Sequence, residues 1–145
     1  MGQAEIGVAR RWFEEVWNQR HKETIFELMD PKAVGHTAAA PTLGPEQWKA
    51  RFWEPFRQSF GDIRVTVDQA LSEGEDVAVR WSASMKHVGP LFGVAPSGRT
   101  VSFSGSTWMR VRDGQIVEGW DTWDFTGLMV RLGATPEILR ALTEQ

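Results

Sequence analysis

The chain has 145 residues, a formal net charge of −3, 41% hydrophobic and 24% charged residues, and no cysteine. This length and composition suit one hydrophobic core, so we expect a single domain over residues 1–145. Acidic and basic residues are interspersed and leave no basic stripe to neutralise phosphates, so nucleic acid is not an expected partner. The absence of cysteine excludes disulfides and thiolate chemistry.

The aromatic composition is unusual, with eight Trp and eight Phe but no Tyr. Aromatic bulk without phenolic hydroxyls indicates core packing or pocket lining, and it excludes a catalytic Tyr. The first residues, MGQAEIGVARRWFEE, are polar and periodic and lack the apolar core of a signal peptide. We therefore expect a cytoplasmic location without membrane association.

The first third of the chain has helical periodicity. Apolar residues from Ile6 to Trp17 recur at three- and four-residue steps, which predicts a helix over residues 3–18. A second, short helix is predicted over residues 23–29, because the following Asp30-Pro31 disfavours its continuation.

Four aromatic residues at a strict four-residue step predict a third helix, which starts at Gly44-Pro45 and ends at Gly61. These residues are Trp48, Phe52, Phe56 and Phe60. Pro55 lies inside this helix and lacks a backbone N–H donor. A kink or break is therefore expected near residues 51–56.

After Gly61 the period changes to two, which predicts strands with one apolar face. The predicted strands cover residues 63–71, 77–86, 101–111 and a segment beginning at residue 115. The turn sequences SEGED and Asp113-Gly114 join them into two hairpins. Helices then follow over residues 127–132 and from Thr135-Pro136 onward. This order predicts an α+β fold with helices packed on one side of an antiparallel sheet of at least four strands.

The segment from Val77 onward also carries motifs that simple alternation does not require. They are Arg80-Trp81, His87-Val88-Gly89, Pro96-Ser97-Gly98-Arg99, Asp113-Gly114-Gln115-Ile116, Glu118, Trp120, Asp124 and Leu132-Gly133, with Val16-Trp17-Asn18 and His36 earlier in the chain. Together they resemble the SnoaL-like polyketide cyclases. The chain departs from the family pattern at Met85-Lys86, where Gly-Thr is usual, and at Arg131, where Gln is usual.

The resemblance implies a cone-shaped α+β barrel in which N-terminal helices pack on a curved antiparallel sheet. Nuclear transport factor two, ketosteroid isomerase and limonene epoxide hydrolase share this architecture. A small hydrophobic ligand would bind between the helices and the concave face, and a homodimer would form through the outer sheet face. Trp108, on the polar face of its strand, suits such a dimer contact. This fold hosts many chemistries, so function must be argued from the site.

Asp124 is the first candidate for a catalytic base. It follows the Trp-rich sequence WDTWDF, so its carboxylate could project into an aromatic pocket where desolvation would raise its pKa. The alternative is that Asp124 caps the helix near Gly127. Asp121 competes with Asp124, because a regular strand would send the two carboxylates to opposite faces. Both faces carry a Trp, so burial leaves the choice open, and the family pattern favours Asp124.

Two histidines are candidate assistants. His87 ends an inward-facing series and could lie at the pocket mouth, although a loop histidine bonded to backbone is the alternative. His36 could reach the cavity from the other side, or lie in a surface loop. Arg80 alternates away from the apolar face and is expected to point outward. Glu118 is expected to partner a basic residue.

Aromatic residues are the candidate substrate contacts. The expected ligand-facing residues are Phe13, Trp17, Phe56, Trp81 and Trp120. Three dispersed histidines without Cys or a chelating spacing predict no metal site, and no nucleotide-binding fingerprint is present, so no cofactor is expected.

Three functions follow from these observations. The first is a cofactor-independent cyclase or isomerase, in which Asp124 removes an α-proton from a hydrophobic carbonyl compound and His87 or His36 assists. The second is a binding protein that holds a hydrophobic molecule without changing it. The third is hydrolysis of an epoxide, which would need Arg80 between two carboxylates inside the cavity.

Overall fold

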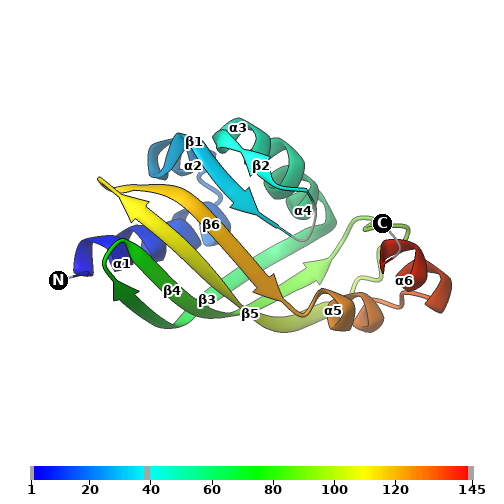
Figure 1. Ribbon diagram of the computed structural model, residues 1–145. Coiled ribbons are helices and arrows are strands. Elements are labelled where there is room, and N and C mark those ends of the chain that lie inside the picture. The colour runs from blue at the N-terminus through cyan, green and yellow to red at the C-terminus, as the bar shows by residue number, and fades with distance from the viewer. Residues whose placement is uncertain (1, 38–39, 144–145) are drawn as a thin grey trace.

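A six-stranded curved sheet with helices packed on it forms the core of the protein (Figure 1). The computed structural model describes residues 2–37 and 40–143. The strands are β1 (Met29–His36), β2 (Thr42–Leu43), β3 (Phe60–Glu73), β4 (Asp76–His87), β5 (Thr100–Arg112) and β6 (Gln115–Trp123). Their spatial order is β2-β1-β6-β5-β4-β3, and every neighbouring pair is antiparallel except β1 and β6. The predicted α+β class is confirmed.

The two predicted hairpins, β3–β4 and β5–β6, are present, and the sheet gains two further strands that periodicity did not predict. Strand β1 has the sequence MDPKAVGH, in which apolar residues do not alternate and Pro31 removes a ladder donor. Its parallel pairing with β6 is irregular between Met29 and Val34. The strand is therefore held by its neighbours and has no β pattern of its own.

The predicted first helix is continuous, but only its first part is α-helical. Helix α1 (Gln3–Arg11) continues as the π-helix η1 (Trp12–Asn18), and α2 (Lys22–Leu28) follows. Asn18 ends η1 with two hydrogen bonds to the backbone of Val65 in β3, of 2.9 Å and 2.7 Å. These bonds attach the end of η1 to the edge strand of the sheet.

The third predicted helix consists of α3 (Gly44–Trp48), the π-helix η2 (Lys49–Trp53) and α4 (Glu54–Ser59). The irregularity expected from Pro55 is present as this π-helical segment, which ends at Trp53, shortly before the proline. An α-helix completes a turn in about 3.6 residues, so a four-residue stripe would drift around it. The wider π turn limits that drift and keeps Trp48, Phe52 and Phe56 on one side.

The chain ends in α5 (Phe125–Arg131) and α6 (Pro136–Thr143), which lie beyond the C-terminal end of β6 (Figure 1). Thr135 precedes Pro136 and accepts a hydrogen bond from the backbone of Ile138, as expected for the start of a helix. None of the helices among the described residues has the length and apolarity that a bilayer span requires.

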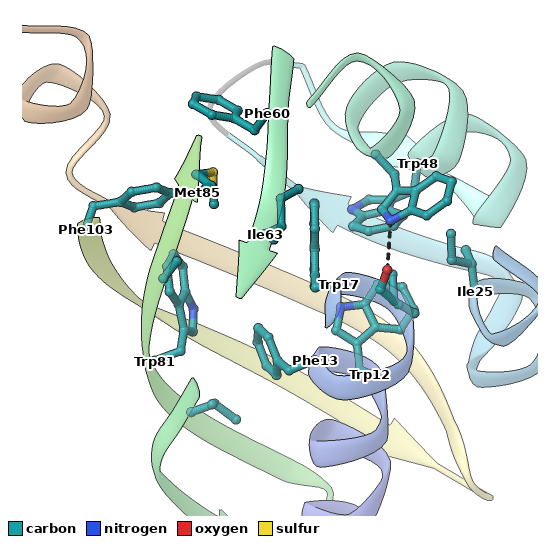
Figure 2. Close-up of a cluster of buried hydrophobic side chains, with 14 of the residues drawn as sticks. Trp12, Phe13, Trp17, Ile25, Trp48, Phe60, Ile63, Trp81, Met85 and Phe103 are labelled. Atoms are coloured by element: carbon teal, nitrogen blue, oxygen red, sulfur yellow. Dashed lines mark hydrogen bonds between the residues drawn. The ribbon is translucent and has the colours of Figure 1, made fainter. Parts of the chain in front are cut away.

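Aromatic side chains dominate the interior between helices and sheet. Figure 2 shows Trp12, Trp17 and Trp48 on the helix side and Trp81 and Phe103 on the strands opposite. Trp12 and Trp48 are in contact, with ring centroids 4.8 Å apart, and Trp81 and Phe103 meet edge to face at 5.9 Å. The functional site lies between these two groups.

Gly105 in β5 provides the space that two of these aromatic side chains need. A Cβ at this position would lie 2.6 Å from Cζ2 of Trp81 and 2.7 Å from both Cβ of Trp123 and the carbonyl oxygen of Thr122. We predict that Gly105→Ala lowers the free energy of unfolding by about 2 kcal/mol or more through overpacking. Chemical denaturation measures this change.

Gly7→Ala is the matched control, because a Cβ built at Gly7 in α1 has no neighbour within 4 Å apart from the adjacent residues and backbone of its own helix. This substitution should raise the free energy of unfolding by about 0.5–1 kcal/mol through helix propensity. Equal stability of the Gly105→Ala variant and the unmodified chain would contradict the predicted packing.

Candidate functional site

A β-bulge in β6 decides which carboxylate faces the interior. Val111 pairs with Ile116, but Arg110 pairs with Glu118, so Val117 is an extra residue in β6. Before the bulge the even-numbered Ile116 points inward, and beyond it the odd-numbered residues do. Asp121 therefore lies opposite Thr107 on the concave face. Regular alternation from Ile116 would have turned Trp120 inward and Asp121 outward.

The interior contains a small chamber of about 60 Å³, enough space for a few water molecules. Asp121 is its one carboxylate among the described lining residues. The others are Trp12, Phe13, Trp17, Trp48, Phe52, Phe56, Val65, Trp81, Ala83, Met85, Phe103, Thr107 and Trp123. Four of the predicted ligand-facing residues, Phe13, Trp17, Phe56 and Trp81, therefore lie where they were expected.

A larger cleft of about 390 Å³ adjoins the chamber. The two spaces share Phe52, Phe56 and Trp123, which form an aromatic partition between them. The cleft also borders Arg51, Pro90, Leu91 and Phe125. The chamber is too small for a ligand of more than a few atoms, and the cleft is the larger space beside it.

A chain of hydrogen bonds orients the carboxylate of Asp121. The indole Nε1–H of Trp81 donates to Oγ1 of Thr107 at 3.0 Å, and the Thr107 hydroxyl donates to Oδ1 of Asp121 at 2.6 Å. An indole can only donate, so the hydroxyl proton of Thr107 is directed toward Asp121. No described residue donates to Oδ2, which leaves that oxygen for a ligand.

Desolvation raises the pKa of Asp121 from its ordinary value of 3.8 to about 6, although the Thr107 hydrogen bond acts to lower it. The side chain is half-buried and borders the chamber, whose other walls are mostly aromatic. The carboxylate is therefore mostly ionised at neutral pH and more basic than an exposed aspartate. These are the properties of a general base.

The expected position of Asp124 in the pocket is wrong. Asp124 is exposed at the end of β6, where its Oδ1 accepts a 2.9 Å hydrogen bond from the backbone N–H of Gly127. It is the N-cap of α5, as the alternative interpretation stated. Strand parity had left the choice between the two carboxylates open, and the bulge at Val117 decides it in favour of Asp121.

His87 is buried and does not border the chamber or the adjoining cleft. Its Nδ1 accepts a 3.1 Å hydrogen bond from the backbone of Ser97 and lies 3.0 Å from the Ser97 hydroxyl. Its ring packs against Phe60, and its Nε2 has no partner among the described residues. His87 is the last residue of β4, and it holds the loop that follows this strand. The expected pocket-mouth position is wrong, and the alternative, a histidine bonded to backbone, is correct.

His36 and Trp120 lie on the outer sheet face, because β1 and β6 pair them in register. Their rings stack with centroids 5.3 Å apart, and His36 Nε2 lies 2.8 Å from Glu118. Arg110 bonds to Glu118 and covers the ring of Trp120 at 5.6 Å. The expected pocket positions of His36 and Trp120 are therefore wrong, whereas Glu118 partners basic residues as predicted.

Arg80 is exposed, as strand alternation predicted. The arrangement of one arginine between two carboxylates, which epoxide hydrolysis would require, is not formed by the described residues of the chamber. Among the described residues, no three His, Asp or Glu side chains come together as metal ligands.

Sequence reasoning missed the pairing of Thr107 with Asp121. A signal was present, because Thr107 is a polar residue in the otherwise apolar inward series of β5. A buried hydroxyl requires a hydrogen-bonding partner, and the hairpin turn limits that partner to a few residues of β6. The bulge, which selects Asp121 among them, has no such signal.

Comparisons with known proteins agree with this architecture. The family model of the SnoaL-like polyketide cyclases matches residues 7–132. A candidate SnoaL-like polyketide cyclase from Jannaschia sp. CCS1 has 26% identity and a TM-score of 0.83 over 92% of this chain and 94% of that one. IdmH of Streptomyces antibioticus, a candidate polyketide cyclase, has 31% identity and a TM-score of 0.78 over 89% and 98%.

AclR of Streptomyces galilaeus, a candidate hydroxylase, has 25% identity and a TM-score of 0.79 over 91% of this chain and 97% of that one. No curated protein matches the chain. The chain belongs to the SnoaL-like polyketide cyclase family, which confirms the resemblance seen in its motifs.

The raised pKa of Asp121 predicts an unusual dependence of stability on pH. The folded chain holds the Asp121 proton up to about pH 6, whereas the unfolded chain releases it near 3.8. This group therefore lowers the free energy of unfolding as the pH rises through that window, by about 3 kcal/mol in total. Asp121→Asn should remove this loss and be more stable at pH 7, as measured by denaturation at several pH values.

Asp124→Asn is the control for that experiment, because asparagine is an equally good N-cap. It should keep both the stability of the unmodified chain and its pH dependence. If Asp121→Asn and the unmodified chain respond identically to pH between 4 and 7, the carboxylate is not desolvated.

Proposed function

We propose that the protein is a cofactor-independent cyclase or isomerase that acts on a small hydrophobic carbonyl compound of the polyketide type, with Asp121 as general acid and base. One observation carries the proposal: the chamber has a single carboxylate among its described lining residues, and that carboxylate has a raised pKa and an oxygen free for a ligand. Membership of the SnoaL-like family supports the reaction class.

The reaction begins when Oδ2 of Asp121 removes a proton from the carbon beside a carbonyl. The C–H electron pair forms a carbon–carbon double bond, and the carbonyl electrons move to the oxygen to give an enolate. In a cyclase, the enolate carbon then attacks a second carbonyl of the same molecule, and the proton held by Asp121 passes to the new alkoxide. In an isomerase, the proton returns to a different carbon.

The aromatic chamber and cleft favour a hydrophobic substrate with one neutral reacting end. The apolar walls exclude bulk water from the enolate and hold the flat body of the substrate by stacking. The negative charge of Asp121 disfavours a carboxylate at the reacting end. The substrate therefore places a ketone or ester carbonyl in the chamber and its larger apolar part in the cleft.

We also propose that two copies of the chain associate through the outer sheet face, in the cytoplasm. The face carries Trp108, which is 50% exposed, beside Trp120. An exposed indole in the middle of a sheet face is typical of an interface. Sedimentation equilibrium that returns the mass of one chain would contradict this part of the proposal.

Deuterium exchange at the α-carbon of candidate polyketide-type ketones tests the base directly, since it requires no complete cyclisation. We predict that Asp121→Asn lowers the exchange rate by about 10²–10⁴-fold, the usual contribution of a general base. Asp124→Asn should keep the rate of the unmodified chain. Mass spectrometry of the recovered ketone measures both.

Retention of exchange by the Asp121→Asn variant would remove Asp121 from the mechanism. Tight binding of such ketones, recovered unchanged and without exchange by the unmodified chain, would favour the alternative of a binding protein.

A further inference from the structure

The proposed reaction requires a group that stabilises the enolate oxygen, and Asp121 cannot do this. Proton removal transfers a negative charge to the carbonyl oxygen of the substrate, and enzymes stabilise such an oxyanion with hydrogen-bond donors already in position. The described residues that line the chamber include no Arg, Lys or His. The donors must therefore be neutral.

Indole N–H groups are the donors that the chamber offers. Trp12 and Trp48 are each only 5% exposed, and both line the chamber. They also line a smaller cavity of about 40 Å³, which shares Thr107 and Asp121 with the chamber. The two indoles thus border both of the spaces that Asp121 borders.

Neither of these two N–H groups donates to another described residue. Among the described side chains, two polar atoms have neither accessible surface nor a hydrogen-bond partner, and these are Oγ1 of Thr42 and Nε2 of His87. The indole nitrogens of Trp12 and Trp48 are not among them, so they retain accessible surface. Both residues are almost fully buried, and both line the two spaces that Asp121 also borders. A buried indole N–H usually has an acceptor, which here would be a ligand atom.

We propose that the indole N–H groups of Trp12 and Trp48 form the oxyanion hole of this site. The rings are in contact, with centroids 4.8 Å apart and planes inclined by 57°, and both border the spaces beside Asp121. This inference rests on the proposed function. As the α-proton moves to Asp121, the negative charge moves from its carboxylate to the enolate oxygen, which accepts from the two indoles. When the proton leaves Asp121, the charge returns.

The proposal also restricts the reacting group of the ligand. Two N–H donors beside an ionised carboxylate suit a neutral carbonyl oxygen that becomes anionic only when the carboxylate is protonated. A phenolate resembles that state once the carboxylate is neutral. The chamber should therefore bind phenolates well when Asp121 is replaced by asparagine.

The test measures binding of 4-nitrophenol to the Asp121→Asn protein, because the ionised form of this phenol absorbs visible light. Adding Trp12→Phe or Trp48→Phe to the Asp121→Asn protein should weaken phenolate binding by about tenfold or more, since a hydrogen bond to a charged group is lost. The pKa of the bound phenol should rise in parallel. A merely structural role for these indoles would not move that pKa.

Trp53→Phe in the same background is the matched control. Trp53 is also a buried helix indole, but its N–H already donates to the backbone oxygen of Val16 at 3.2 Å, and it does not line the chamber. This variant should leave phenolate affinity and the pKa of the bound phenol unchanged. Unchanged affinity in both Trp12→Phe and Trp48→Phe would overturn the proposal.

A second measurement needs no further substitution and covers the case in which a tryptophan variant does not fold. In the ¹⁵N-labelled Asp121→Asn protein, the indole proton resonances of Trp12 and Trp48 should move downfield when 4-nitrophenolate binds, whereas that of Trp53 should not. Binding without such a shift would overturn the proposal.

The two proposals fail separately, because phenolate binding requires no turnover. Indole shifts in a protein that never exchanges an α-proton would support the oxyanion hole and contradict the enzyme. If the unmodified chain exchanges the α-proton but neither Trp12→Phe nor Trp48→Phe changes phenolate affinity, only the oxyanion hole is contradicted.

Discussion

The function proposed for this protein depends on one carboxylate, that of Asp121, which is held among aromatic rings. Burial acts against the charge of Asp121, and a single chain of hydrogen bonds from Trp81 through Thr107 acts in its favour. Burial has the larger effect, so the pKa of Asp121 rises to about 6 and not further. The group is therefore charged at neutral pH and more basic than an exposed aspartate, as the proposed role of general base requires.

The bulge at Val117 makes this arrangement possible. Without it, β6 would present Trp120 to Thr107 and turn Asp121 to the outer face, where Glu118 and Arg110 now form a solvated ion pair. One extra residue thus separates two environments along the same strand. Inward residues beyond the bulge serve the chamber, and outward residues form a charged and aromatic surface.

Much of the fold could be predicted from the sequence because its causes are local. Alternation in β4 and β5 and the turn at Asp113-Gly114 are enough to define the hairpins. The four-residue aromatic step from Trp48 anticipated a helix, and Pro55 its irregularity. Strand β1 lacks any such pattern, since its place comes from pairing with β6, and it could not be predicted.

The site was only partly predictable, because some of its residues are placed by local periodicity and others by strand pairing. Phe13, Trp17 and Trp81 lie on regular faces, so their inward direction follows from periodicity. Which of Asp121 and Asp124 faces the interior is decided by a one-residue bulge, and the sequence QIVEGW gives no sign of that bulge. The family motif pointed to Asp124, which is instead a helix cap.

The most direct test of this account is a ¹³C NMR titration of the aspartate carboxyl groups, assigned to Asp121 by comparison with Asp121→Asn. The account predicts that the Asp121 resonance titrates with a midpoint near 6, well above the ordinary value of 3.8. A midpoint near 4 would mean that the carboxylate is solvated, and it would contradict both the desolvated chamber and the base proposed within it.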